Sequence, residues 1–180
     1  MITKVLIAAL VLTVALAIGL GIYVATRPAE FRVTRSATIN APADAVFAQV
    51  NNLPSWEAWS PWAKLDPNMK NTYTGPASGV GATQAWVGNA QVGEGRMTIL
   101  ESRPNELVRI KLEFFKPFAG TNTVDFTFVP RGEQTEVAWT MYGPNTLMSK
   151  IMGLFMDMDK MCGTAFEQGL QSLDKVAQTH

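Results

Sequence analysis

The sequence contains one histidine and one cysteine, so the usual residues of nucleophilic and metal chemistry are nearly missing. The histidine, His180, is the last residue, and terminal residues are rarely ordered, which argues against a histidine-dependent triad or a histidine metal site. Cys162 has no second cysteine with which to pair, so the redox compartment of the protein stays open. No cluster of histidine, cysteine and carboxylate residues has the spacing of a metal site, and we expect no metal and no cofactor.

An excess of either charge is also missing, because 15 basic residues balance 15 acidic residues. Every acidic residue lies at or after Glu30, whereas Lys4 and Arg27 precede it. Without those two basic residues, the rest of the chain carries 13 positive and 15 negative charges. Nucleic acid requires a strongly basic surface, so this balance predicts no nucleic-acid partner.

Charge and proline are both absent from residues 5–24. About 20 apolar residues are needed to cross the hydrocarbon core of a membrane as a helix. A cleaved signal peptide is the alternative, but its apolar core is usually about 7–15 residues long, and the Ala-x-Ala pattern at 15–17 lies in the middle of the run. We therefore predict an uncleaved single-pass anchor within residues 1–27, which places the protein in the cell membrane.

The side of the membrane that the rest of the chain occupies stays open. The segment before the apolar run has Lys4 and the α-amine, and the segment after it has Arg27, Arg32 and Arg35. Counting positive charges favours a cytoplasmic domain by a small margin. Arg32 and Arg35 belong to a predicted strand, however, and a signal anchor would place the domain outside.

Residues 28–180 are enough for one folded domain with a single core. A first strand is predicted at 31–39, where apolar residues alternate with polar ones. Arg35 falls on its apolar side and therefore needs a partner. A short helix at 43–50 follows, with Pro42 and Asp44 at its start. Further alternating or β-rich stretches predict six more strands, at residues 70–74, 82–87, 91–102, 108–114, 124–128 and 137–141.

The last third of the chain, residues 144–176, is predicted to be one long helix. Its first half is rich in methionine and has one apolar face. That face consists of Leu147, Ile151, Leu154, Met158, Met161 and Ala165. A narrower stripe in the second half is predicted to clamp the sheet, and it consists of Phe166, Leu170, Leu173 and Val176.

The order of these elements predicts the fold class. Consecutive strands joined by tight turns form an antiparallel meander, and the predicted helices lie only before and after it. We therefore predict an α+β fold, a curved antiparallel sheet of about 6–7 strands around a long C-terminal helix, preceded by one N-terminal transmembrane helix.

Several stretches in this order carry a resemblance to a known family. They are RSATINAPADAVF at 35–47, WEAWSPW at 56–62, GVG at 79–81 before Trp86, and GEQTEVAW at 132–139. Together they resemble the SRPBCC superfamily, the helix-grip fold of START lipid-transfer domains, birch-pollen-allergen-like proteins and polyketide cyclase/dehydrase-type proteins. The final helix, at 158–173, resembles that of membrane-anchored bacterial members.

The resemblance implies a deep apolar cavity between the sheet and the last helix. Members bind lipids, steroids, polyketides or other hydrophobic molecules, and a few catalyse cyclisation or hydrolysis. The superfamily shares no catalytic residue, so the fold alone assigns no chemistry. The methionines favour such a cavity, because methionine adapts to variable ligands whereas a dry core favours leucine and isoleucine.

The residues predicted to line the cavity lie on the inward faces of the expected strands and helix. They are Trp56, Trp59, Trp86, Met97, Ile99, Ile110, Leu112, Phe126, Trp139, Met141, Met152, Phe155, Met156 and Met161. The alternative is a plain packed core. For the tryptophans between 56 and 62, the alternatives are lids on the core, the mouth of a cavity, or the membrane interface.

Glu101 is the one weak candidate for a catalytic acid or base. It shares the strand phase of Met97 and Ile99, and a buried carboxyl has a raised pKa. The alternative places it in solvent at the end of its strand. The sequence thus favours a membrane-tethered binding or carrier domain for a hydrophobic small molecule or lipid. A polyketide cyclase/dehydrase-like enzyme and a regulatory protein-interaction module are the alternatives, and the ligand and the oligomeric state stay open.

Overall fold

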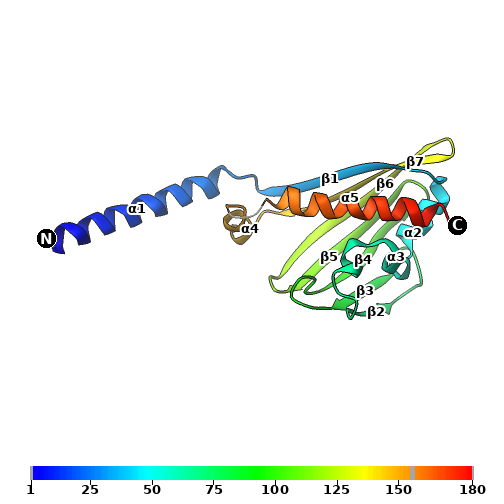
Figure 1. The fold of residues 1–180 in the computed structure, drawn as a ribbon, viewed down its shortest axis with the longest axis horizontal. Coiled ribbons are helices and arrows are strands. Elements are labelled where there is room, and N and C mark those ends of the chain that lie inside the picture. Colours follow the sequence, from blue (N-terminus) through cyan, green and yellow to red (C-terminus); the bar gives the residue numbers. More distant parts are fainter. Residues whose placement is uncertain (1, 155–156, 180) are drawn as a thin grey trace.

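The computed structural model describes residues 2–154 and 157–179, apart from the side chains of Met152 and Met158. One seven-stranded antiparallel sheet has the order β1-β7-β6-β5-β4-β3-β2, and a long helix, α5, runs along one of its faces (Figure 1). The strands are β1 (Glu30–Ile39), β2 (Lys70–Thr74), β3 (Thr83–Val87), β4 (Glu94–Arg103), β5 (Leu107–Lys116), β6 (Gly120–Arg131) and β7 (Gln134–Pro144). The helices are α1 (Ile2–Thr26), α2 (Ala43–Asn51), α3 (Trp56–Trp59), α4 (Leu147–Met152) and α5 (Met158–Ala177), with 3-10 turns at Leu53–Ser55 and Pro61–Lys64.

The sheet is a meander closed by its first strand. From β2 to β7, consecutive strands pair with one another, because turns join them directly. β1 then pairs with β7 over its whole length, from Glu30 opposite Pro144 to Ile39 opposite Thr135. The predicted α+β helix-grip architecture is confirmed.

The part of α5 from Phe166 onward holds the sheet. Phe166, Leu170, Leu173 and Ala177 recur every three or four residues, so they share one face of the helix, and all four are buried. A fully buried leucine or phenylalanine contributes about 1.5–3 kcal/mol through the hydrophobic effect. This face matches the predicted clamp at three positions. At the fourth, Ala177 is buried, whereas the predicted Val176 is only half-buried.

The prediction of one helix over residues 144–176 is wrong, because the last third forms two helices. Gly153 follows α4, and α5 begins after Asp157, whose side chain accepts a hydrogen bond from the backbone N–H of Lys160 at 3.0 Å. Asp157 therefore acts as a helix cap and starts a new helix. The predicted apolar face is not continuous, since Leu147, Leu154 and Met161 are 62%, 47% and 48% exposed.

α1 extends away from the sheet, as Figure 1 shows. It has 25 residues, most of them apolar, and none of them is buried against the rest of the protein. By length and composition, α1 is able to cross a membrane. Its last turn lies beside α4, where the Lys150 ammonium donates a hydrogen bond to the carbonyl of Val24 at 3.2 Å.

Candidate functional site

The candidate site is the inner face of the sheet, along which α5 lies. Strand pairing aligns Val33, Met141, Val124, Ile110 and Ile99 in one row across β1, β7, β6, β5 and β4. All five side chains are buried. Met97 lies two residues from Ile99 on the same face and is also buried. The inner face is thus apolar over most of its width, as the alternation predicted.

An aromatic cluster fills one part of this interior. Trp139 of β7 stacks on Phe166 of α5, with ring centroids 4.4 Å apart and an interplanar angle of 6°. Phe126 lies 4.7 Å from Trp139, and Trp56 and Trp59 of α3 lie 6.1 and 5.7 Å from it. Four of the residues predicted to line a cavity, Trp56, Trp59, Phe126 and Trp139, therefore pack against one another, and their contact with a ligand stays a prediction.

The tryptophans of α3 act as lids on the core, one of the readings that the sequence allows. The indole N–H of Trp56 donates to the carbonyl of Val50 at 2.9 Å, and Trp56 and Trp59 are 6% and 0% exposed. Such burial is incompatible with a place at the membrane interface. Pro61 and the short turn at Pro61–Lys64 then lead the chain back toward the sheet.

The inner face is less completely covered toward the end of the sheet nearest α1. Phe31 is the second residue of β1, only a few residues after α1 ends, and it is half-buried. Trp86 and Phe114 are also half-buried and lie edge to face, with centroids 6.0 Å apart. Gly95 lies between them in the pairing, and the Trp86 indole occupies the space that a side chain at Gly95 would need. Leu112, beside Phe114 on β5, is half-buried too.

A chain of hydrogen bonds leads from α3 into this face. Glu57 accepts from the Tyr73 hydroxyl at 2.7 Å and from the Asn71 amide at 3.2 Å. The Asn71 amide oxygen accepts from Gln84 Nε2 at 3.0 Å. Gln84 is 5% exposed, and its Oε1 has no hydrogen-bond partner among the described residues. Burial, together with the bond to Glu57, raises the pKa of Tyr73 above its ordinary value, so its hydroxyl stays protonated and donates.

The chain of bonds fixes the orientation of the Gln84 amide. Glu57 is an acceptor only, so Asn71 must turn its NH2 group toward Glu57 and its oxygen toward Gln84. Gln84 must then donate through Nε2, which leaves its oxygen as the free group. A buried acceptor without a partner costs about 1–3 kcal/mol, so this oxygen favours a ligand with a hydrogen-bond donor.

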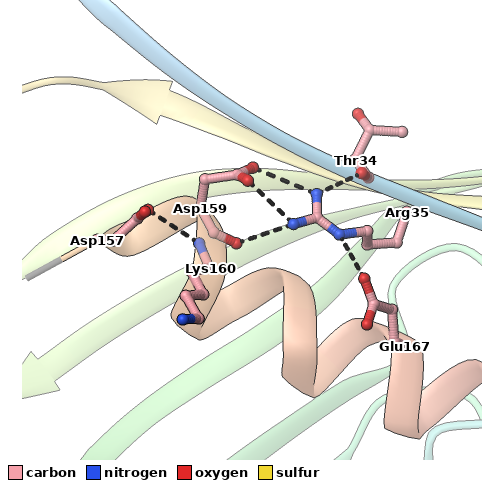
Figure 2. A network of polar contacts seen from close by, with 6 residues as sticks. All are labelled: Thr34, Arg35, Asp157, Asp159, Lys160 and Glu167. Atoms are coloured by element: carbon pink, nitrogen blue, oxygen red, sulfur yellow. Dashed lines mark hydrogen bonds and ion pairs between the residues drawn. The ribbon is translucent and has the colours of Figure 1, made fainter.

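Arg35 joins β1 to the first half of α5, as Figure 2 shows. Its guanidinium donates to Asp159 through Nη2 at 2.9 Å and to Glu167 through Nε at 2.8 Å. Asp159, Gly163 and Glu167 are four residues apart, so they share a helix face, and the guanidinium lies where a side chain at Gly163 would be. The hydrogen bond to Asp159 raises the pKa of Arg35, and the same bond lowers the pKa of Asp159. The need for a partner at Arg35 is thus met by two carboxylates.

Glu101 lies on the opposite face from the one predicted. A β-bulge between Ile99 and Glu101 shifts the pairing by one residue, so Glu101 lies opposite Arg109. Its carboxylate accepts from Arg109 Nη1 at 3.2 Å, and Arg109 is also paired with Asp125 at 2.8 Å. Glu101 therefore belongs to an ion-pair network on the outer face of the sheet, and it does not share the phase of Met97.

The methionine-rich segment gives a mixed result. Met161 was expected to face the interior, but it is 48% exposed because α5 begins anew at Met158. The described part of the structure leaves out Phe155, Met156 and the side chain of Met152, which is the last residue of α4. A role in ligand contact stays a prediction for all four. Within residues 2–154 and 157–179, no three histidine, cysteine or acidic residues gather as metal ligands would.

The sequence did not predict the polar chain of Glu57, Asn71 and Gln84. The sequence offered one signal for Gln84, the alternation of side chains along a strand. Gln84 is two residues from Trp86 and must therefore share its face of the sheet. Alternation alone does not show that a short helix brings a carboxylate over that face.

These features define a helix-grip protein with an apolar inner face that carries the buried acceptor of Gln84. Two further buried polar atoms lack a partner among the described residues, the Asn52 amide oxygen and the Trp139 indole N–H. The family model described as polyketide cyclase / dehydrase and lipid transport matches residues 30–178. The chain belongs to that family, which confirms the resemblance seen in its sequence. A comparison with curated protein sequences gives no match.

Solved structures show the same fold at low sequence identity. Protein CV1439 from Chromobacterium violaceum is 17% identical, with a TM-score of 0.57, and the match covers 83% of this chain and 98% of that one. The Aha1 dimer from Colwellia psychrerythraea is 19% identical, with a TM-score of 0.58 and coverages of 82% and 96%. Norcoclaurine synthase from Thalictrum flavum, solved with dopamine and hydroxybenzaldehyde, is 14% identical, with a TM-score of 0.57 and coverages of 84% and 88%.

Proposed function

We propose that this protein is a membrane-tethered domain that binds a hydrophobic small molecule or lipid between the inner face of its sheet and α5. Residues 1–27 provide the tether, and residues 28–180 provide the binding domain. The observation that carries the proposal is the half-buried apolar surface of Trp86, Leu112 and Phe114 near a buried acceptor on Gln84.

The chemistry of that surface suggests the class of ligand. An apolar body would remove the half-buried side chains from water, which is favourable by about 25 cal/mol per Å². A hydroxyl or N–H on the ligand would satisfy the Gln84 oxygen. The family description includes lipid transport, and that description supports a ligand of this class.

The enzyme alternative receives no support from Glu101, its candidate acid. That residue is paired with arginine on the outer face, where a ligand in the interior cannot reach it. The proposal is therefore one of binding or carriage without a named reaction.

Native mass spectrometry of the full chain, extracted from membranes in a mild detergent, tests the proposal. We expect a bound mass that is released when the protein is denatured and that belongs to an amphipathic molecule with a hydroxyl or amine. A chain that emerges empty from several detergents, and that takes up no added long-chain alcohol, would overturn it.

A further inference from the structure

A small apolar surface lies beside the end of α1. It consists of Leu147 and Met148 of α4 and of Leu154 just after it, which are 62%, 52% and 47% exposed. We call these three residues the α4 surface. Exposed side chains of this size are common singly, but three of them on one short segment mark a contact with something apolar.

One hydrogen bond joins α4 to the anchor, and two more join the residue before α4 to the link after the anchor. Lys150, on α4 itself, donates to the carbonyl of Val24. Just before α4, the backbone N–H of Asn145 donates to the carbonyl of Ala29 at 2.8 Å, and the Asn145 amide donates to that of Pro28 at 3.2 Å. α4 therefore moves with the last turn of α1 and with the link that follows it. Figure 1 shows α4 between the end of α1 and the near end of the sheet.

The depth of the α4 surface follows from the length of the apolar run. A helix rises about 1.5 Å per residue, so residues 5–24 span about 30 Å, the thickness of the hydrocarbon core. Val24 then lies at the edge of that core, and the Lys150 ammonium lies at the same depth. Tyr23 and Arg27, whose guanidinium is 4.5 Å from the Tyr23 ring centroid, are the residue types that favour the interface.

We infer that the α4 surface lies in the boundary between headgroups and acyl chains of the bilayer that holds α1. This inference rests on the proposed tether. The bilayer is favoured over a partner protein because the hydrogen bond from Lys150 holds α4 at the level of Val24, where the apolar run of α1 ends.

One consequence concerns the binding site. β1 begins at Glu30, directly after the link, so the end of the inner face that starts there lies close to the same membrane surface. A hydrophobic ligand would then pass between the bilayer and the site over a short path along α4. The α4 surface would then serve both as the membrane contact and as the surface along which the ligand passes.

Nitroxide labelling of the full chain in phosphatidylcholine nanodiscs tests this placement. In a Cys162→Ala background, one label is placed at Met148→Cys and a second, separately, at Leu154→Cys. Val14→Cys, in the middle of α1, is the control for membrane, and Val80→Cys, which replaces a 60% exposed valine before β3, is the control for water. Power saturation with oxygen and with a water-soluble nickel chelate then reports the depth of each label.

We expect the labels at 148 and 154 to favour oxygen over the nickel chelate, at a depth between the two controls. Labels that match Val80→Cys would overturn the inference while leaving the tether intact, provided that Val14→Cys is immersed. Labels shielded from both reagents would show a protein contact and would also overturn it. A water-exposed label at Val14→Cys would overturn the tether and the inference together.

Discussion

Arg35 Nη2 lies 2.9 Å from Asp159 Oδ2, and this contact ties the sheet edge to the first turn of α5. From Phe166 onward α5 is held by buried apolar residues, whereas its N-terminal turns are held at β1 by a cation between Asp159 and Glu167. Ion pairs that reach solvent are weaker than a packed apolar face. The N-terminal turns of α5 are therefore held less firmly than the rest of the helix.

Arg35→Met is expected to loosen the first turns of α5 without unfolding the protein. Cys162 is the sole thiol of the chain, and it lies half-buried between the two carboxylates along the helix, so it reports this opening. We expect its reaction with N-ethylmaleimide to become faster in Arg35→Met, with little change in the melting temperature. Arg131→Met, which breaks an ion pair in the β6–β7 turn, is the matched control and should leave the rate unchanged.

The same contact predicts a dependence on pH. Since Arg35 lowers the pKa of Asp159 in the folded protein, the contact stabilises the fold above the ordinary value of 3.8 and is lost as the pH falls through the lower, folded value. Hydrogen exchange of the first turns of α5 should thus be constant from neutral pH to about 4 and should accelerate below that, after correction for the intrinsic rate. In Asp159→Asn, the acceleration should be absent.

Gln84→Met is expected to weaken binding of ligands that carry a donor. The loss of one hydrogen bond of about 0.5–1.5 kcal/mol corresponds to a two- to tenfold rise in Kd, as an order of magnitude. A long-chain alcohol and its methyl ether, compared by native mass spectrometry, separate this effect from general damage. The wild type should prefer the alcohol, and Gln84→Met should bind both equally. A preference that survives in the variant would show that the alcohol donates to an acceptor other than Gln84.

Phe166→Ala is expected to destabilise the domain by about 3–5 kcal/mol, because it opens a cavity where Phe166 stacks on Trp139. Val176→Ala, on the half-buried flank of the same helix, should cost far less. Urea unfolding of the full chain in detergent, followed by tryptophan fluorescence, measures both. Equal losses in the two variants would show that the clamp is not centred on Phe166.

Glu101→Gln is expected to leave ligand binding unchanged, since Glu101 is paired with Arg109 on the outer face. Both side chains are more than a third exposed, so the loss of stability should stay below about 1 kcal/mol. Native mass spectrometry and urea unfolding measure the two quantities. A variant that no longer retains a ligand would restore Glu101 as a candidate site residue.

Much of the fold could be predicted because the strands alternate cleanly. In β1 and β7, the residues of the inner face recur at every second position, Arg35 included, so alternation predicts which side chains face the interior. Prediction from sequence periodicity failed at two irregularities. One extra residue in β4 moved Glu101 to the outer face, and Asp157 divided the predicted long helix in two.

The candidate site was less predictable, because its polar members are far apart in the sequence. Arg35 could be recognised as a charge on an apolar face, but its partners lie 124 and 132 residues away. Gln84 could be placed on the inner face, but its unpartnered oxygen depends on how Asn71 and Glu57 are turned. Such contacts follow from the assembled fold and have no local pattern.

The most direct test of the central claim is a pair of tryptophan substitutions compared by native mass spectrometry of the full chain. Leu112→Trp fills the half-buried end of the inner face, whereas Leu100→Trp replaces a 50% exposed residue of β4. If the ligand lies between the sheet and α5, the bound mass should be lost from Leu112→Trp and retained in Leu100→Trp under identical extraction. A bound mass that persists in Leu112→Trp, or that is lost equally from both variants, would contradict the account.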